Sequence, residues 1–271
     1  MKHIIFTLFV ALLLVACEVT PETEFTDRPV VCCYLSEGES PVLTVQKLIP
    51  FQGDATFSDE DINRLNITIT DLTTSTNYLL YNISDGTYCN NDFIAESGHK
   101  YKLNFLYDGV EVEASTTVPS APQNVSFSST TIGVMSFDFK STSATRAPND
   151  GIEITWSNED GDYYIVEGKT NSTSSIRDID DDEQIPAKSF KLNYTQGSSS
   201  TLSSSDFNYF GSYEISVIHI NSEYAIMSQG GSTSSTTLLD VKGNIDGGYG
   251  IFTGISSVTR SINVTKQSAP F

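Results

Sequence analysis

Residues 101–114 constrain the fold most strongly, because apolar and mostly polar side chains alternate along two runs that flank a single turn. The turn pair, Asp108-Gly109, suits a type I′ turn, in which both central residues have positive φ. Each run places its apolar residues on one face of a strand: Tyr101, Leu103, Phe105 and Tyr107, then Val110, Val112 and Ala114. The pattern predicts a β-hairpin with one face in a core and the other in water.

Short runs rich in β-branched and aromatic residues continue on both sides of this hairpin, separated by polar or glycine-containing turns. We see no helical period of useful length beside the early runs. The predicted strands are 30–35, 42–48, 65–71 and 77–81 before the hairpin, and 134–139, 151–157, 163–168, 189–194 and 212–220 after it. The chain therefore predicts an all-β fold.

A proline-containing segment, Val118-Pro119-Ser120-Ala121-Pro122, interrupts this pattern, since proline cannot donate to a strand ladder. The chain has 271 residues, and domains of about 100 to 150 residues are the usual unit. We therefore expect two tandem antiparallel β-sandwiches. An immunoglobulin-like sandwich spans 30–118, a linker spans 119–125, and a second sandwich with long polar loop insertions spans 126–271.

The second expected sandwich has a more specific pattern. Trp156 lies near the end of one predicted strand, and in a later predicted strand Tyr213, Ile215 and Val217 share one face in a run that continues to His219. This arrangement resembles fibronectin type III domains. The resemblance implies that Trp156 lies in the core and that Tyr213 begins the sixth strand.

The beginning of the chain predicts export. Lys2 and His3 precede an apolar run of 13 residues, 4–16, which is shorter than the roughly 20 residues that span a bilayer and is typical of a secretory signal. Leu14-Val15-Ala16-Cys17 then resembles the bacterial lipobox, which implies cleavage before Cys17 and acylation of Cys17, including palmitate. We expect a signal peptide at 1–16 and a lipidated tether at 17–29. A plain signal peptide with an incidental Cys17 is the alternative.

The charge balance excludes one class of partner. With 34 acidic and 15 basic side chains, the net charge is −19, so phosphate backbones repel the chain and we expect no nucleic-acid partner.

Four cysteines and three histidines leave little for a zinc site, and we expect no cofactor. Asp178, Asp180 and Asp182 are weak calcium candidates. A solvated acidic loop is the alternative, because the turn glycine and distant glutamate of an EF-hand are missing.

Three further residue types have a structural and a chemical interpretation. At most one of Cys32 and Cys33 can meet Cys89 in one core, because neighbouring strand residues face opposite sides; a disulfide and free thiols both stay open. The glycines of 247–250 lack phosphate-loop spacing and favour a turn or bulge close to another backbone. His99 and His219 occur without a Gly-x-Ser-x-Gly elbow, so we expect no catalytic residues and no enzyme.

Several segments taken in order resemble a family of Bacteroidota outer-membrane lipoproteins, domain of unknown function 4249. The segments are 98–103, Asp108-Gly109, 114–119, Ile154-Thr155-Trp156 and 244–252. The resemblance implies a lipoprotein of the outer membrane, at the cell surface or on the periplasmic face, often encoded beside a TonB-dependent receptor. The family assigns no catalytic residues.

These features together predict a lipid-anchored outer-membrane binding or accessory protein. Its expected partner is a TonB-dependent receptor in nutrient uptake, with a small molecule, glycan or peptide as ligand. A cell-surface adhesin or stalk lipoprotein is the main alternative. A surface enzyme is a third, since the two carboxylates of a glycosidase leave no spacing signature.

Overall fold

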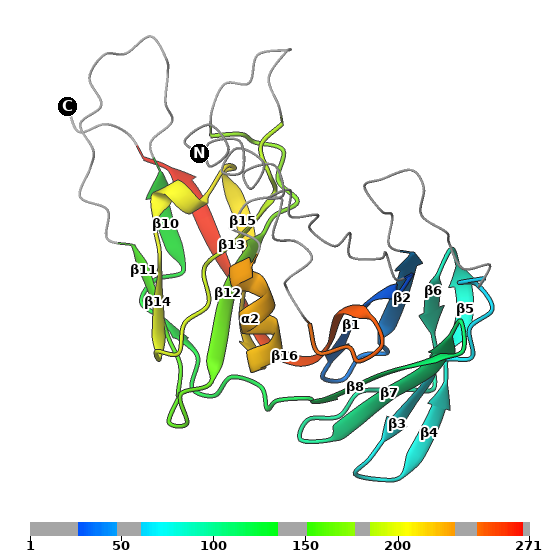
Figure 1. The fold of residues 1–271 in the computed structure, drawn as a ribbon. Coiled ribbons are helices and arrows are strands. Elements are labelled where there is room, and N and C mark those ends of the chain that lie inside the picture. Colours follow the sequence, from blue (N-terminus) through cyan, green and yellow to red (C-terminus); the bar gives the residue numbers. More distant parts are fainter. Residues whose placement is uncertain (1–26, 48–60, 135–150, 177–184, 231–242, 268–271) are drawn as a thin grey trace, which may run out of the picture.

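The fold is that of a computed structural model in which residues 27–47, 61–134, 151–176, 185–230 and 243–267 are described. The first half of the chain forms eight strands (Figure 1): β1 (Pro29–Ser36), β2 (Val42–Lys47), β3 (Thr68–Asp71), β4 (Thr76–Leu79), β5 (Tyr81–Ser84), β6 (Thr87–Cys89), β7 (Lys100–Tyr107) and β8 (Val110–Thr117). Each predicted strand in this half overlaps an observed strand, but the strand predicted at 77–81 crosses the break between β4 and β5, and β6 was not predicted.

The second half adds eight strands and two helical segments: β9 (Ser126–Phe127), β10 (Thr131–Val134), β11 (Ile152–Thr155), β12 (Tyr163–Lys169), β13 (Ser189–Lys191), β14 (Ser199–Leu202), η1 (Ser204–Asp206), β15 (Gly211–Ile220), α2 (Ser222–Gly230) and β16 (Tyr249–Lys266). Neither described helix is long and apolar enough to cross a membrane. The predicted strand 134–139 lies outside the described residues beyond Val134, where β10 ends.

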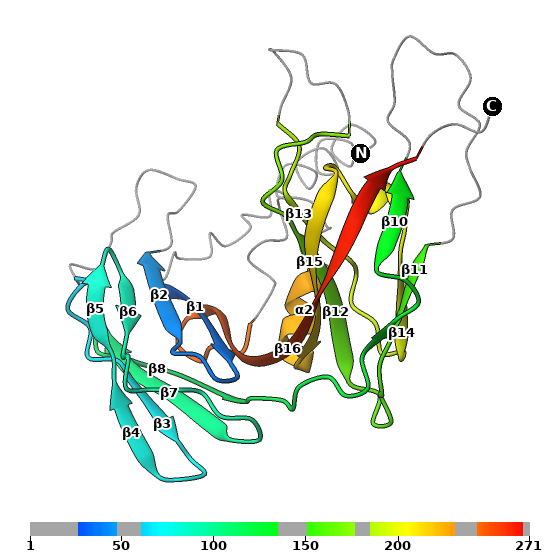
Figure 2. The same cartoon turned by 180° about the vertical axis from the view of Figure 1, so that it is seen from behind.

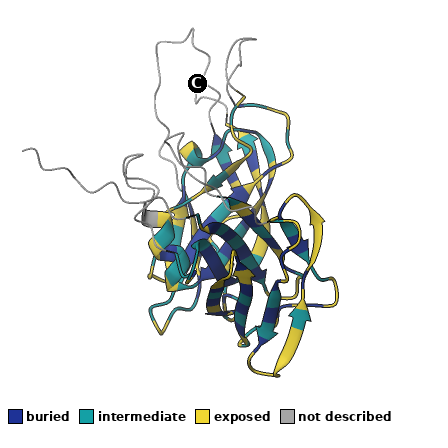
Figure 3. Ribbon diagram, turned by 45° about the vertical axis from the view of Figure 1, so that its right-hand side comes forward, coloured by how far each residue is buried: buried dark blue, intermediate teal, exposed yellow. Residues whose placement is uncertain are grey.

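Two β-sandwiches share one long sheet, and the all-β class is confirmed. The shared sheet has the strand order β13-β12-β15-β16-β1-β2-β6-β5, with β10 also paired to β16. The sheet β4-β3-β7-β8 packs against one end of it, and the sheet β14-β11-β9 packs against the other (Figures 1 and 2). Buried residues lie mainly along the strands, and the turns are largely exposed (Figure 3).

The hairpin β7–β8 has the geometry that its sequence predicts. Asp108 and Gly109 both have positive φ, at 49° and 75°. The four apolar residues that alternate along β7 are buried, because they face the first core. The type I′ turn and the inward face are therefore confirmed.

A tyrosine fixes the start of a central strand in each sandwich. The Tyr101 hydroxyl accepts a hydrogen bond from the Glu96 N–H at 2.9 Å. The Tyr213 hydroxyl accepts one from the Tyr209 N–H at 3.0 Å. Such a bond to backbone just upstream is the tyrosine corner of immunoglobulin-like and fibronectin-like sandwiches. Trp156 is buried in the second core, as its pattern predicts.

The long strand β16 departs from the expected domain boundaries. We expected 126–271 to form the second sandwich alone, but the first part of β16 pairs in parallel with β1, from Val30↔Tyr249 to Ser36↔Ile255. The Phe252 side chain is completely buried in the first core. β1 is a central strand whose backbone needs partners on both sides, and β16 supplies the second. The segment 119–125 thus links the two sandwiches, but it is not a complete domain boundary, because residues 249–255 of β16 rejoin the first sandwich.

We expected antiparallel sandwiches, but two strand pairs are parallel: β1 with β16 and β10 with β16. Because β16 crosses from one sandwich to the other, the sandwiches share a continuous hydrogen-bonded element.

Two glycines of β16 permit this crossing. Gly250 has a φ of 103°, and a Cβ there would overlap the Val31 backbone. At Gly254 a Cβ would overlap the backbone of Thr117 and Val118 in the first sandwich. The prediction that glycines in 247–250 bring the chain close to another backbone is confirmed.

Helix α2 lies on the outer face of the shared sheet, near the junction of the sandwiches (Figure 1). Its Ala225 is buried beside Ile165 and Ile220. Its Tyr224 ring meets Tyr34 of β1 edge to face, with centroids 5.6 Å apart. The sequence did not predict this helix.

Candidate functional site

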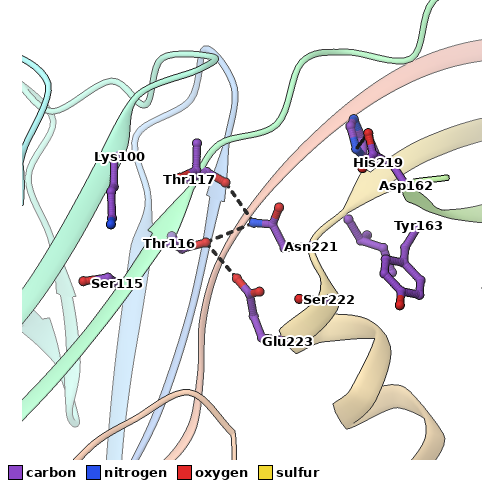
Figure 4. A pocket seen from close by; sticks show the side chains of 11 residues that line it. Lys100, Ser115, Thr116, Thr117, Asp162, Tyr163, His219, Asn221, Ser222 and Glu223 are labelled. Carbon is purple, nitrogen blue, oxygen red and sulfur yellow. Dashed lines mark hydrogen bonds and ion pairs between the residues drawn. The ribbon is translucent and has the colours of Figure 1, made fainter. Parts of the chain in front are cut away.

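A cleft of about 420 Å³ lies where the two sandwiches meet. The first sandwich contributes Lys100 from the start of β7 and residues 115–117 from the end of β8. The second contributes residues 162–163 and 219–223, which include the start of α2 (Figure 4). This size lies within the range of small-ligand sites, about 300 to 1,000 Å³.

The Thr116 hydroxyl organises the floor of the cleft. It donates to Glu223 Oε1 at 2.9 Å. It accepts from Asn221 Nδ2 and from the Gly254 N–H, each at 3.0 Å. A hydroxyl has one hydrogen and two acceptor positions, so all three are used. The buried Thr116 thus ties the second sandwich to the first (Figure 4).

Asn221 and Glu223 extend this tie. Asn221 Nδ2 also lies 2.8 Å from the Thr117 carbonyl oxygen and 3.2 Å from that of Gly254. Glu223 Oε1 accepts a second hydroxyl bond, from Thr253 at 3.1 Å. We name Thr116, Asn221, Glu223 and Thr253 the junction network. It fixes one oxygen of the Glu223 carboxylate and leaves Oε2 without a hydrogen-bond partner among the described residues.

His219 forms the other end of the cleft wall (Figure 4). Its Nδ1 lies 2.8 Å from the Ser120 carbonyl oxygen, and its Nε2 lies 3.2 Å from Asp162 Oδ2. Its ring stacks on Tyr164, with centroids 4.7 Å apart. Both ring nitrogens thus face acceptor oxygens, and His219 joins the inter-sandwich linker to the second sandwich.

His99 makes a separate contact in the first sandwich. Its Nδ1 lies 2.8 Å from Asp71 Oδ2, and its Nε2 lies 3.5 Å from Glu96 Oε2. Burial disfavours the Asp71 carboxylate, but hydrogen bonds from His99, Thr73 and Thr74 outweigh it and hold the pKa of Asp71 below its usual value. Neither His99 nor His219 contacts a serine hydroxyl within the described part of the chain, so no Ser-His-Asp arrangement forms at either.

The three described cysteines are free thiols. Cys32 and Cys33 lie on β1, whereas Cys89 lies on β6 opposite Val42, with β2 between the two strands. Two strand spacings amount to about 9.6 Å, which exceeds the roughly 7 Å that a disulfide spans between Cα atoms. Of the two alternatives, the free thiols are correct. Burial raises the pKa of the Cys33 thiol, which disfavours its reactive thiolate.

The remaining sequence candidates lie outside the described residues. Cys17 with the signal peptide falls in 1–26, and Asp178, Asp180 and Asp182 fall in 177–184. Within the described segments, no group of three or more His, Cys, Asp or Glu side chains could hold a metal ion.

The cleft has no signature in the sequence from which it could have been predicted. Two of its charged side chains, Lys100 and Glu223, come from opposite halves of the chain and from different sandwiches. The one local signal near it is Asn221-Ser222-Glu223, where Asn or Ser precedes an acid as at helix starts. That signal predicts a helix start, and only the tertiary structure brings it to β8.

No family model matches the chain, and no curated protein matches it. Among solved structures, the crystal structure of chicken CNTN1 FN1-FN3 domains is similar, at 13% identity with a TM-score of 0.27. The match covers 89% of this chain and 65% of that one. The fold assignment rests on the strands, the sheets and the two tyrosine corners of this chain.

Proposed function

We propose that this protein is a non-catalytic binding protein whose ligand or partner segment occupies the cleft between the sandwiches. The observation that carries this proposal is the junction network. It holds a concave polar site in one geometry, with walls from both sandwiches. A preorganised site binds without first losing conformational freedom.

We also propose that the protein is anchored by acylated Cys17 in the outer membrane, at the cell surface or on the periplasmic face, and serves a TonB-dependent receptor in nutrient uptake. The lipobox and the acidic tether support this location. The segments 98–103 and 114–119, which carry the resemblance to the lipoprotein family, include Lys100 and residues 115–117 of the cleft. The family resemblance and the cleft therefore fall on the same part of the chain.

The first test is to purify the native lipoprotein from mildly solubilised outer membranes and identify by mass spectrometry what remains bound. A stoichiometric TonB-dependent barrel supports the uptake function. Recovery of the protein alone, or with self-polymers or fimbrial subunits, refutes it in favour of the adhesin or stalk alternative.

A matched pair of variants asks whether the cleft takes part. Ser115 is exposed at the cleft, so Ser115→Arg narrows the cleft without removing a side chain of the junction network. Ser261→Arg places the same side chain at an exposed position of β16 that does not line the cleft. We expect Ser115→Arg to impair uptake or co-purification and Ser261→Arg to leave both unchanged. Equal effects of the two variants would remove the cleft from the proposal.

The anchor has its own test. Cys17→Ala should abolish labelling by a palmitate analogue and release the protein from membranes. Retention of the label on the variant would refute acylation at Cys17.

A further inference from the structure

We propose that the cleft takes a zwitterionic ligand, a free amino acid or short peptide with both termini uncapped. Lys100 binds its carboxylate, and Glu223 binds its ammonium group. This inference rests on the proposed function, because it names the ligand class of the same cleft.

The Glu223 carboxylate is suited to bind the ammonium group of such a ligand. Its side chain is partly buried, and its Oε1 is held by the hydroxyls of Thr116 and Thr253. None of the ion pairs among the described residues includes Glu223. A fixed, partly buried carboxylate with a free oxygen and no counter-ion attracts a cation that can donate hydrogen bonds. A ligand ammonium group meets both requirements.

Asp162, the other acid of the cleft, is less available. Its Oδ2 already faces His219 Nε2 at 3.2 Å. Glu223 Oε2, by contrast, has no hydrogen-bond or ion-pair partner among the described residues. The ammonium group is therefore assigned to Glu223.

Lys100 is suited to bind the carboxylate of the ligand. It lines the cleft, and it takes part in none of the ion pairs among the described residues. Two other lysines are paired, Lys102 with Glu113 and Lys191 with Glu167. In a chain with a net charge of −19, a lysine at a cleft without a carboxylate partner is available for an anionic group.

The placement of these two charges decides between ligand classes. Lys100 and Ser115 lie on one side of Glu223, and Asp162 and His219 lie on the other (Figure 4). Opposite charges on separate elements match a molecule with opposite charges at its ends. The hydroxyls of Ser115, Ser222 and Tyr163 line the space and can bond peptide groups. A neutral saccharide would leave both charges without a partner, which disfavours it.

Calorimetry on the purified full-length lipoprotein in detergent tests the ligand class. The probes are triglycine, N-acetyl-triglycine, triglycine amide and maltotriose. We expect triglycine to bind and each capped peptide to bind at least about tenfold more weakly, because each loses one charge-assisted contact. Equal binding of all three peptides, or binding of maltotriose alone, would overturn the proposal.

Two variants assign the ends of the ligand. Lys100→Met should weaken triglycine binding and abolish the preference for triglycine over its amide. Glu223→Gln should abolish the preference over the N-acetyl form. Lys169→Met is the matched control, because Lys169 is an exposed lysine outside the cleft and takes part in none of the ion pairs among the described residues. Trp156 fluorescence, which reports on the second core, verifies that each variant is folded.

The outcomes separate the ligand class from the proposed function. If Ser115→Arg impairs uptake or co-purification but triglycine does not bind, the cleft remains the functional site and the zwitterionic class is wrong. If triglycine binds as proposed but Ser115→Arg leaves uptake and co-purification intact, the ligand class stands and the cleft has no part in the uptake function.

Discussion

Replacing Phe252 with alanine should destabilise the first sandwich, although Phe252 lies near the end of the chain. The side chain is completely buried in the first core. Its N–H donates to Asn244 Oδ1 at 3.0 Å, and its carbonyl accepts from Asn244 Nδ2 at 2.6 Å. A Phe→Ala change at such a site costs about 3 to 5 kcal/mol in transfer free energy and cavity formation. That is a large part of the roughly 5 to 15 kcal/mol that stabilises a typical domain.

Two local probes can follow this change during urea unfolding. Trp156 is the single tryptophan of the chain and lies in the second core, so its fluorescence reports on the second sandwich. Cys33 is fully buried in the first core, so its alkylation, located by peptide mass spectrometry, reports on the first. Because β16 belongs to both sandwiches, we expect the two wild-type transitions to coincide. Phe252→Ala should lower the urea midpoint of both.

The matched control for Phe252→Ala is Ile262→Ala, which removes a buried side chain of the same strand from the second core. We expect a loss of about 2 to 5 kcal/mol that the Trp156 probe detects directly. The reasoning is refuted if Phe252→Ala shifts the Trp156 transition but Cys33 resists alkylation up to the same urea concentration as in the wild type. That result would mean that the first part of β16 does not belong to the first sandwich.

Three further predictions follow from the junction and the first sandwich. Thr116→Val should lower the unfolding free energy by about 1 to 3 kcal/mol in a urea melt, because three polar partners lose a bond, whereas Thr117→Val on the exposed face should change little. Gly250→Val should prevent soluble folding, judged by circular dichroism and yield, because φ is 103° and a Cβ overlaps the β1 backbone. The depressed pKa of Asp71 stabilises the fold above its unfolded value of about 3.9, and this stability is lost as the pH falls through the folded pKa. Urea melts of wild type and Asp71→Asn should therefore differ near pH 6, and the difference should shrink as the pH falls below the unfolded value; a constant difference would contradict this.

Local alternation was sufficient to predict most strands. The hairpin β7–β8 and the strand β15 each show period-two patterns that depend only on which face is buried, so neighbouring residues carry the signal. The type I′ turn was predictable for the same reason, since Asp108-Gly109 satisfies its φ angles locally. Helix α2 was missed because its sequence has no clear apolar face. It is held by contacts to β1 and β12, such as Tyr224 with Tyr34.

The sequence by itself determined the all-β class, the break at 119–125, the buried face of each strongly alternating strand and the inward position of Trp156. Tertiary structure alone decided that residues 249–255 return to β1, more than 200 residues earlier in the chain. It alone also decided that Lys100 and Glu223 line one cleft. The physical reason is the range of the interactions. Strand alternation and turn geometry depend on adjacent residues, whereas the pairing of β16 and the junction network depend on backbone and hydroxyl partners that only the folded chain brings together.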